Sequence, residues 1–544
     1  MLFYQTVKRG GGALSLAIAA LLALPILWVA ASVLQPAGEA WRHIAATLLP
    51  LYVANTALLL VLVAAGVISI GVASAWLVAS YRFPGVRLLE WALVLPLAMP
   101  AYVMAYAYTD WLQFTGPVQS GLRALTGWQA REVWFPEIRS LGGAAVVLSL
   151  AFYPYVYLIA RTAFRDLPRS VLEAGRLAGQ PAWRNFLRVA LPLARPAIAA
   201  GTALALMETL ADFGTVSYFA LEVFTTGIFK AWLSMGDSVA AAQLSSCLLA
   251  FVLLVLALER ASRGRAAFHG VAAKPVPPPP LRGARAALAC AACALPVLLG
   301  FMLPAAILLQ LALGDPQARW GARLAGLVGN SVVISGVTAV AAVILALTMA
   351  YAARLSKSRV AAAANRFAAL GYAMPGAVIA LGVLVPLGRL DNWLAGLIEE
   401  ASGVKTGLLL TGTIAALVYA CLVRFLAVAL QTTEAGLARI TPSMEDAARS
   451  LGAAPAAALA RVHAPLLAPS LATAALLVFV DVMKELPATF ALRPFDFDTL
   501  AVEAYHLAMD ERLAEAAVPS LVIVAVGLVP LLALSRRYFQ ATRS

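Results

Sequence analysis

The sequence predicts an all-α integral membrane protein of about 12 transmembrane helices, arranged as two parallel six-helix repeats. Three observations predict this fold. Of the 544 residues, 62% are hydrophobic and 12% are charged, whereas a soluble domain carries about 25% charged residues. Twelve apolar stretches reach the roughly 20 residues that a helix needs to cross a bilayer. The two halves of the chain also repeat the same short motifs at a nearly constant spacing.

Helices are the expected element because lipid offers no hydrogen-bond partner, so every backbone polar group must be paired within the protein. The predicted spans of the first half are 13–34, 51–80, 86–111, 141–164, 195–216 and 240–258. Those of the second half are 286–312, 326–354, 362–388, 407–430, 466–490 and 515–535. A cleaved signal peptide is the alternative for the first stretch, but its apolar run exceeds the 7–15 residues typical of a signal core.

Basic residues of the short loops predict that both termini are cytoplasmic, because Lys and Arg accumulate on that side of a membrane. Lys8 and Arg9 precede the first span, and basic residues then follow every second span, among them Arg82, Arg87, Arg161, Arg165, Arg260, Arg285, Arg354, Arg366, Arg536 and Arg537. The net charge of +13 is therefore explained mostly by topology. No nucleic-acid partner is predicted, since the basic residues are dispersed among these loops.

A proline-rich segment divides the chain into three parts. Residues 1–263 form the first transmembrane half, 264–285 a cytoplasmic linker with four prolines at 277–280, and 286–544 the second half. A proline run favours extended, solvated backbone. Six spans lie on each side, so both halves have the same orientation and a pathway is expected between them.

The repeat itself is visible in paired motifs. Asn55-Thr56 recurs as Asn330-Ser331, and Met99-Pro100 recurs as Met374-Pro375, in both cases 275 positions later. Further along the chain the spacing becomes 273, as a short difference in loop length would produce.

Between the fourth and fifth spans each half carries the same pattern of small residues. The first half has Glu173-Ala174-Gly175, then Gly179, then Pro192. The second half has Asp446-Ala447-Ala448, then Gly452, then Pro465, at the same spacing. Small residues allow a helix to approach another surface closely, and a glycine can end a helix in the left-handed conformation. An amphipathic helix on the lipid surface is the alternative, but lipid binding requires no repeated spacing.

This duplicated pattern resembles the Glu-Ala-Ala loop of the permease subunits of binding-protein-dependent ABC importers, E-A-A-x3-G-x9-I-x-L-P. It departs from that motif by mild changes at Gly175, Asp446, Val189, Val462 and Ala464. The resemblance implies a role in ATPase coupling for Glu173, Ala174, Gly179, Pro192, Asp446, Ala447, Gly452 and Pro465. It also implies three partners, namely two copies of a cytoplasmic ABC ATPase subunit, a periplasmic substrate-binding protein and the lipid of a bacterial inner membrane.

The chain has no G-x-x-x-x-G-K-[ST] phosphate loop. It is therefore expected to be a transport subunit rather than an enzyme. We expect no cofactor on this chain, with ATP and Mg bound by the partner ATPase.

Acidic residues occur in the apolar helix after each Glu-Ala-Ala loop. Glu208 and Asp212 match Asp481 and Glu485 at the spacing of 273. Residues four apart share a helix face, and a carboxylate within a span costs at least about 2.5 kcal/mol, so it usually serves a function. We expect these four acids to line one central substrate path. The alternative is a helix-packing network in which Lys484 pairs with them.

Carboxylates are hard oxygen donors that suit hard cations. The two acidic segments and the whole chain also resemble the fused ferric-iron permeases, which implies ferric iron as the substrate and a transient Fe(III) site at the four acids. Thiamine, a polyamine, a sugar phosphate or a phosphonate remain alternatives for the same machine. A secondary transporter is the alternative of a different class, although the paired Glu-Ala-Ala loops argue against it.

Overall fold

The computed structural model describes residues 2–36, 38–127, 129, 132, 135–167, 180–263, 278–314, 321–356, 358–441, 443–444, 447, 450–452 and 459–541. Among these residues every regular element is a helix. Within the part of the chain that the structure describes, eleven helices are long and apolar enough to cross a membrane, or twelve if one bent pair counts as a single span. The predicted all-α membrane fold is confirmed.

The chain forms two compact units. The first comprises residues Met1–His43, Ile228–Ser246 and Trp320–Glu503, and the second comprises Ile44–Gly227, Cys247–Arg319 and Ala504–Ser544. Each unit therefore combines segments from both sequence halves. Four of the five unit boundaries fall inside helices: α2 (Glu39–Thr47), α12 (Phe224–Phe229), α13 (Ser238–Arg263) and α24 (Leu500–Met509).

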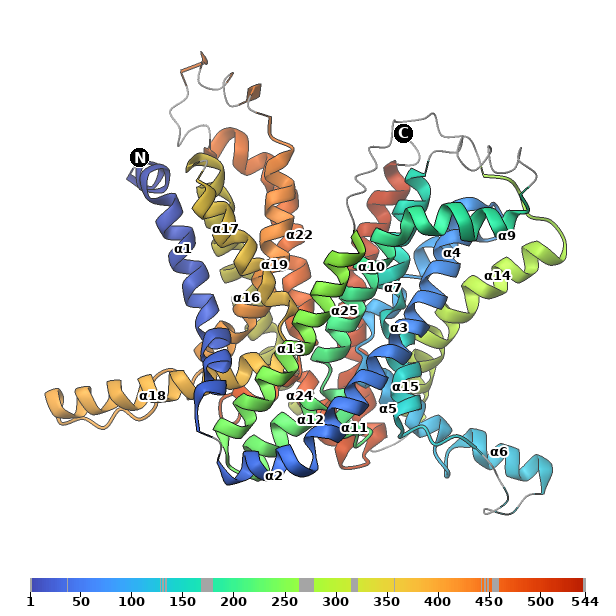
Figure 1. Cartoon of the computed structure of the whole chain (residues 1–544), viewed down its shortest axis with the longest axis horizontal. Coiled ribbons are helices and arrows are strands. Elements are labelled where there is room, and N and C mark those ends of the chain that lie inside the picture. Colours follow the sequence, from blue (N-terminus) through green and yellow to red (C-terminus); the bar gives the residue numbers. More distant parts are fainter. Residues whose placement is uncertain are drawn as a thin grey trace. The chain divides into compact units, whose positions relative to one another are not determined.

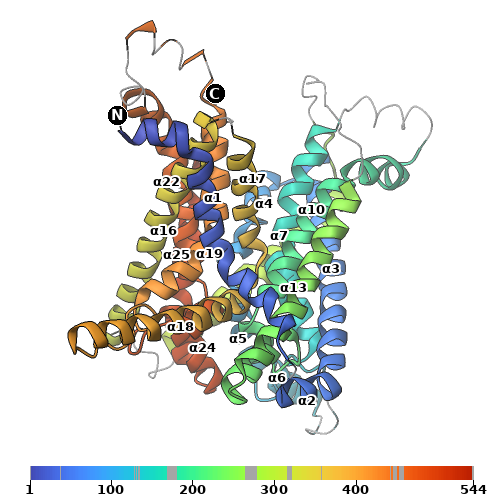
Figure 2. The same ribbon diagram turned by 60° about the vertical axis from the view of Figure 1, so that its left-hand side comes forward.

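The first unit is built on helices of the second sequence half. Its helices are α1 (Leu2–Ala31), α16 (Ala322–Ser356), α17 (Arg359–Ala368), α18 (Gly376–Ser402), α19 (Ile414–Ala438), α22 (Ala464–Met483) and α23 (Pro487–Leu492). α19 packs against α16 and α22, and α1 packs against α16, α17 and α18 (Figures 1 and 2). The first helix of the chain thus packs on helices of the second sequence half.

The second unit is built on helices of the first sequence half. They are α3 (Leu49–Ser80), α4 (Val86–Ala92), α5 (Ala101–Leu112), α6 (Pro117–Thr126), α7 (Leu141–Asp166), α9 (Ala182–Asn185), α10 (Leu191–Ala211) and α11 (Gly214–Tyr218). The late helices α14 (Ala284–Val297), α15 (Leu303–Gly314) and α25 (Leu513–Ala541) complete it. α7 packs against α3 and α10, and α15 packs against α25. Buried Tyr153 and Tyr157 place the centre of this unit on α7.

The third predicted span is broken at the repeated Met-Pro motif. A short 3-10 helix, Leu95–Ala98, ends before Met99, and α5 starts after Pro100 with the chain bent by 93°. In the second half the 3-10 helix Ala369–Ala373 ends before Met374, and α18 starts after Pro375. Proline lacks an amide hydrogen and disfavours helical conformation in the preceding residue. The continuous helices expected over 86–111 and 362–388 are therefore wrong.

Three other predicted spans have different ends. The spans expected over 195–216 and 466–490 stop at Ala211 and Met483, before the second acid of each half. The tenth span runs from Ile414 to Ala438 rather than over 407–430, because Thr413 caps its first turn with its hydroxyl. Ser140, 273 positions earlier, caps α7 in the same way.

Candidate functional site

The Glu-Ala-Ala loops are described only in part. Glu173, Ala174, Gly179 and Asp446 lie outside the described residues. Ala447 accepts two hydrogen bonds at its backbone carbonyl, from the Leu451 amide at 3.1 Å and the Ser450 hydroxyl at 2.9 Å. Gly452 follows with φ of +77°. This is the left-handed conformation expected for the glycine that turns the chain.

The prolines of the two motifs begin equivalent helices. Pro192 lies in the first turn of α10 and Pro465 in the first turn of α22, and each of these helices continues without a break from helical residues before it. A five-residue π-helix precedes each of them, Phe186–Ala190 in the first half and Leu459–His463 in the second. π-Helical segments are rare in proteins, and those that occur often lie at functional sites. The repeat therefore extends to the geometry that connects each loop to its membrane helix.

The second acid of each pair caps a short helix. Asp212 accepts hydrogen bonds from the amides of Thr215 and Val216 at 3.0 and 3.1 Å and from the Thr215 hydroxyl at 3.0 Å. The first amides of a helix have no partner within the helix, and a side-chain carboxylate satisfies them. Asp212 thereby fixes the start of α11 directly after α10 ends.

Glu485 does the same for α23. Its carboxylate accepts from the amides of Ala488 and Thr489 at 3.1 and 3.0 Å and from the Thr489 hydroxyl at 3.0 Å. It also lies 3.5 Å from the guanidinium of Arg424 on α19. Glu485 and Arg424 are only 4% and 7% exposed, so this is a buried ion pair.

The first acid of each pair has a different environment. Asp481 forms an ion pair with Lys484 at 2.9 Å, and both side chains are partly exposed, at 19% and 31%. Glu208 is half-buried on α10, one turn before Asp212. Glu208 and Asp212 belong to one compact unit, and Asp481 and Glu485 belong to the other.

Pairing with basic groups, which was the alternative for the acids, is thus present at both acids of the second half. In the described part of the chain no group of three or more His, Cys, Asp and Glu side chains is placed to hold a metal ion.

Sequence reasoning missed several buried charged residues, among them Arg424 and Asp391. Arg424 stands inside an otherwise uncharged apolar stretch, and a charge in such a stretch is by default a functional or structural signal. Asp391 on α18 is fully buried and accepts hydrogen bonds from the amides of Leu409, Leu410 and Thr411. It folds the segment that follows α18 back onto that helix.

The repeated Asn-Thr and Asn-Ser pairs also have a structural role. Asn330 donates to the backbone carbonyl of Asp498 at 3.0 Å, and the Ser331 hydroxyl accepts from the amide of Leu500 at 2.9 Å. In the first half the Thr56 hydroxyl accepts from the amide of Phe224 at 3.4 Å. Each pair holds the start of the short helix that follows the acidic segment, α24 or α12.

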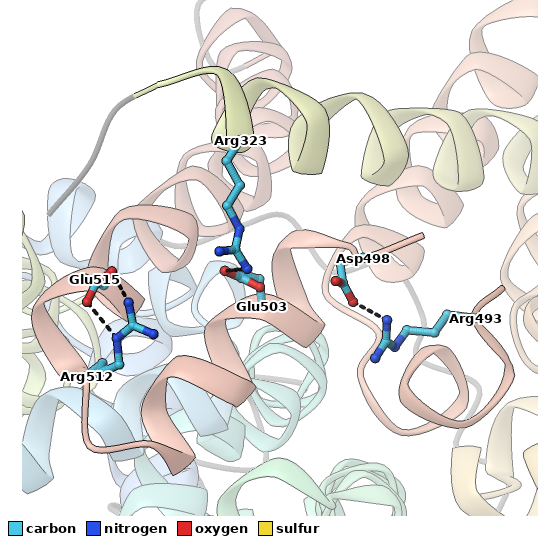
Figure 3. Close-up of polar contacts among 6 residues, drawn as sticks. All are labelled: Arg323, Arg493, Asp498, Glu503, Arg512 and Glu515. Atoms are coloured by element: carbon cyan, nitrogen blue, oxygen red, sulfur yellow. Dashed lines mark hydrogen bonds and ion pairs between the residues drawn. The ribbon is translucent and has the colours of Figure 1, made fainter. Parts of the chain in front are cut away.

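Ion pairs reinforce the segments around α24 (Figure 3). Arg493 and Asp498 pair within the loop between α23 and α24, and Arg323 at the start of α16 lies 2.8 Å from Glu503 of α24. Arg512 and Glu515 pair at the start of α25, at 2.6 Å. Arg493, which would otherwise be available to offset the membrane acids, is therefore engaged by Asp498.

Comparison with known proteins agrees with this duplicated architecture. The family model described as "Binding-protein-dependent transport system inner membrane component" matches the chain twice, over residues 66–265 and 342–541. The chain is 28% identical to the "Fe(3+)-transport system permease protein FbpB 2" of Haemophilus influenzae over 493 residues, which are 89% of this chain and 90% of that protein.

Two further relatives match only part of the chain. The "Sulfate transport system permease protein CysT" of Escherichia coli is 30% identical over 34% of this chain and 66% of its own length. The "Molybdenum transport system permease protein ModB" of Escherichia coli is 30% identical over 28% of this chain and 64% of its own length.

Proposed function

Because this chain belongs to the family of binding-protein-dependent transport system inner membrane components, we propose that it is the permease of a ferric-iron importer. In this proposal a periplasmic binding protein delivers iron, and two copies of a separate ATPase subunit bind ATP and Mg. The chain itself binds no cofactor, and both of its termini are cytoplasmic.

The full-length similarity to a ferric-iron permease carries the choice of substrate. That relative aligns over 89% of the chain, including both halves, whereas the sulfate and molybdenum permeases align over 34% and 28%. The acids of the two repeated segments agree in chemistry, since carboxylate oxygens suit a hard trivalent cation. An oxyanion is the second candidate, favoured by the partial relatives and by Arg424, but Glu485 balances that guanidinium.

The four acids have two different roles in the proposed path. Asp212 and Glu485 fix the short helices α11 and α23, which follow the ends of α10 and α22. Glu208 and Asp481 present their carboxylates to the cation, with Lys484 reducing the net charge near Asp481. Weak, partly balanced charges suit a path, because a substrate that binds too tightly would not leave it.

The proposed mechanism is alternating access. The two Glu-Ala-Ala loops bind the two ATPase subunits. The residues that make this contact are Glu173, Ala174, Gly179 and Pro192 in the first loop and Asp446, Ala447, Gly452 and Pro465 in the second. ATP binding brings these subunits together, and the loops transmit the movement to the membrane helices. The states interchange only because ATP and the loaded binding protein bind them with different affinity.

Uptake by vesicles that contain the whole complex tests the substrate. ATP-dependent uptake of ferric iron is expected, with no uptake of sulfate, molybdate, thiamine, putrescine or a sugar phosphate. Selective uptake of sulfate or molybdate would reject iron while leaving the family assignment intact. Transport that continues without any ATPase partner would instead favour a secondary transporter.

A further inference from the structure

A polar bridge joins α4 to α7 in the first half. The Glu90 carboxylate on α4 pairs with Arg161 and, at 2.8 Å, with Arg165, both on α7. The Tyr157 hydroxyl on α7 donates to the Glu90 backbone carbonyl at 2.8 Å. The Glu90 and Arg161 side chains are only 11% and 15% exposed, so water screens this contact weakly.

The bridge connects two elements with different tasks. α7 ends at Asp166, shortly before the first Glu-Ala-Ala loop. α4 has only seven residues and leads through the 3-10 helix Leu95–Ala98 to the break at Met99-Pro100. A helix this short has no stability of its own, so its direction is set by the contacts it makes.

The second half has a bridge at the equivalent positions, built from different residues. Asn365 on α17 lies 275 positions after Glu90, and Glu434 on α19 lies 273 positions after Arg161. The Asn365 amide donates to the Glu434 carboxylate at 2.9 Å and to the Met349 carbonyl on α16 at 3.4 Å. α19 ends at Ala438, shortly before the second Glu-Ala-Ala loop.

Both residue types have changed between the halves, but the bridged positions have not. An acid and an arginine join the two helices in the first half, and an amide and an acid join them in the second. A contact that only filled space would need neither a hydrogen bond nor a charge in both versions.

We propose that these polar bridges, Glu90 with Arg161 and Arg165 and Asn365 with Glu434, are positioning contacts that couple each Glu-Ala-Ala loop to the break in the third span of its half. Each bridge makes the short helix before the break move as one body with the helix that carries the loop. The inference rests on the proposed drive by a separate ATPase, but it does not depend on iron being the substrate.

A distance measurement tests the one-body movement directly. Spin labels are placed on α4 and α7 at the exposed residues Leu88 and Thr162, in a background without the four native cysteines. In the complete complex, the distance should be the same without nucleotide and after trapping with ATP and vanadate. In Glu90→Gln, the two states should give different or broadened distances. If the distance between the two labels already differs between the nucleotide-free and the trapped state while Glu90 is present, the proposal is wrong.

ATP hydrolysis provides the functional readout. Glu90→Gln should lower the stimulation of hydrolysis by the iron-loaded binding protein about 10-fold, a coupling effect of ordinary size, with basal hydrolysis and assembly retained. Transfer of the second-half chemistry, Glu90→Asn with Arg161→Glu, should restore most of the stimulation. Arg512→Gln removes the ion pair between the half-exposed Arg512 and Glu515 as a control and should change nothing.

Other outcomes separate the two proposals. If Glu90→Gln lowers thermal stability as much as it lowers the stimulation of ATP hydrolysis, and the double variant does not restore the stimulation, the bridge is merely structural. If Glu90→Gln does not assemble, Arg165→Gln tests the same contact, because Arg165 is 38% exposed and leaves Arg161 in place. If iron uptake fails in the wild type while the label distances behave as expected, the iron proposal fails and the coupling inference stands.

Discussion

The side-chain amide of Asn55 on α3 donates a hydrogen bond to the backbone carbonyl of Glu222 at 2.8 Å. Asn330 on α16 makes the same bond to the carbonyl of Asp498 in the other compact unit. Long-range contacts of this kind, 167 and 168 residues apart in sequence, hold the segments after the acidic residues in place. These hydrogen bonds explain why the same residue types occur at the Asn-Thr and Asn-Ser positions of the two halves.

Loss of either asparagine should destabilise its own unit. Asn55→Leu removes the donor and leaves the Glu222 carbonyl without it, which costs about 1–3 kcal/mol. Asn330→Leu should cost a similar amount for the same reason. Thermal unfolding in detergent measures both effects, with Asn392→Leu on the exposed part of α18 as the control. Melting temperatures that match the wild type for both variants would show that the bonds contribute nothing.

Neutralising the two capping acids should have unequal effects. Asp212→Asn weakens a helix cap and should cost about 0.5–2 kcal/mol. Glu485→Gln also breaks the buried ion pair with Arg424, and breaking such a pair costs about 3–5 kcal/mol. Adding Arg424→Met to Glu485→Gln should recover part of that loss. Equal stabilities of the two single variants would contradict the importance of the buried ion pair.

Glu208 and Asp481 should affect transport more than stability. Asp481 and Lys484 are partly exposed, and such ion pairs contribute about 0–1 kcal/mol. The free energies of unfolding of Glu208→Gln and Asp481→Asn should therefore lie within about 1 kcal/mol of the wild-type value. Both variants should nevertheless take up ferric iron more slowly. Lys484→Gln is the control, since it breaks the pair and keeps the acid. Unchanged iron uptake in both acid variants would remove these residues from the path.

The backbone at Gly452 should matter for assembly with the ATPase. Its φ of +77° is unfavourable for a β-branched residue, whereas asparagine tolerates it. Among the described residues, apart from its two neighbours in the chain, no atom lies within 4 Å of the position that a Cβ atom would take there. Gly452→Val should reduce co-purification with the ATPase, and Gly452→Asn should retain it. The same comparison at Gly179 tests the first loop, and full co-purification of both valine variants would refute the role of these turns.

Much of this protein follows from local sequence. Low charge and long apolar runs determine the membrane class, since no other solvent accommodates them. The spacing between Gly452 and Pro465 marks a turn followed by a new helix, because glycine and proline act on the backbone next to them. The paired motifs identify the repeat for the same reason, as each carries its own local geometry.

The tertiary structure decided what local patterns leave open. The spacing of Asp212 and Glu485 from the preceding acids fits a continuing helix face, yet both helices have already ended and each acid caps the next one. Arg424 reaches Glu485 across 61 residues, and α1 packs on helices of the opposite sequence half. Such contacts depend on which distant surfaces meet, and helical periodicity defines a face to be covered without specifying the segment that covers it.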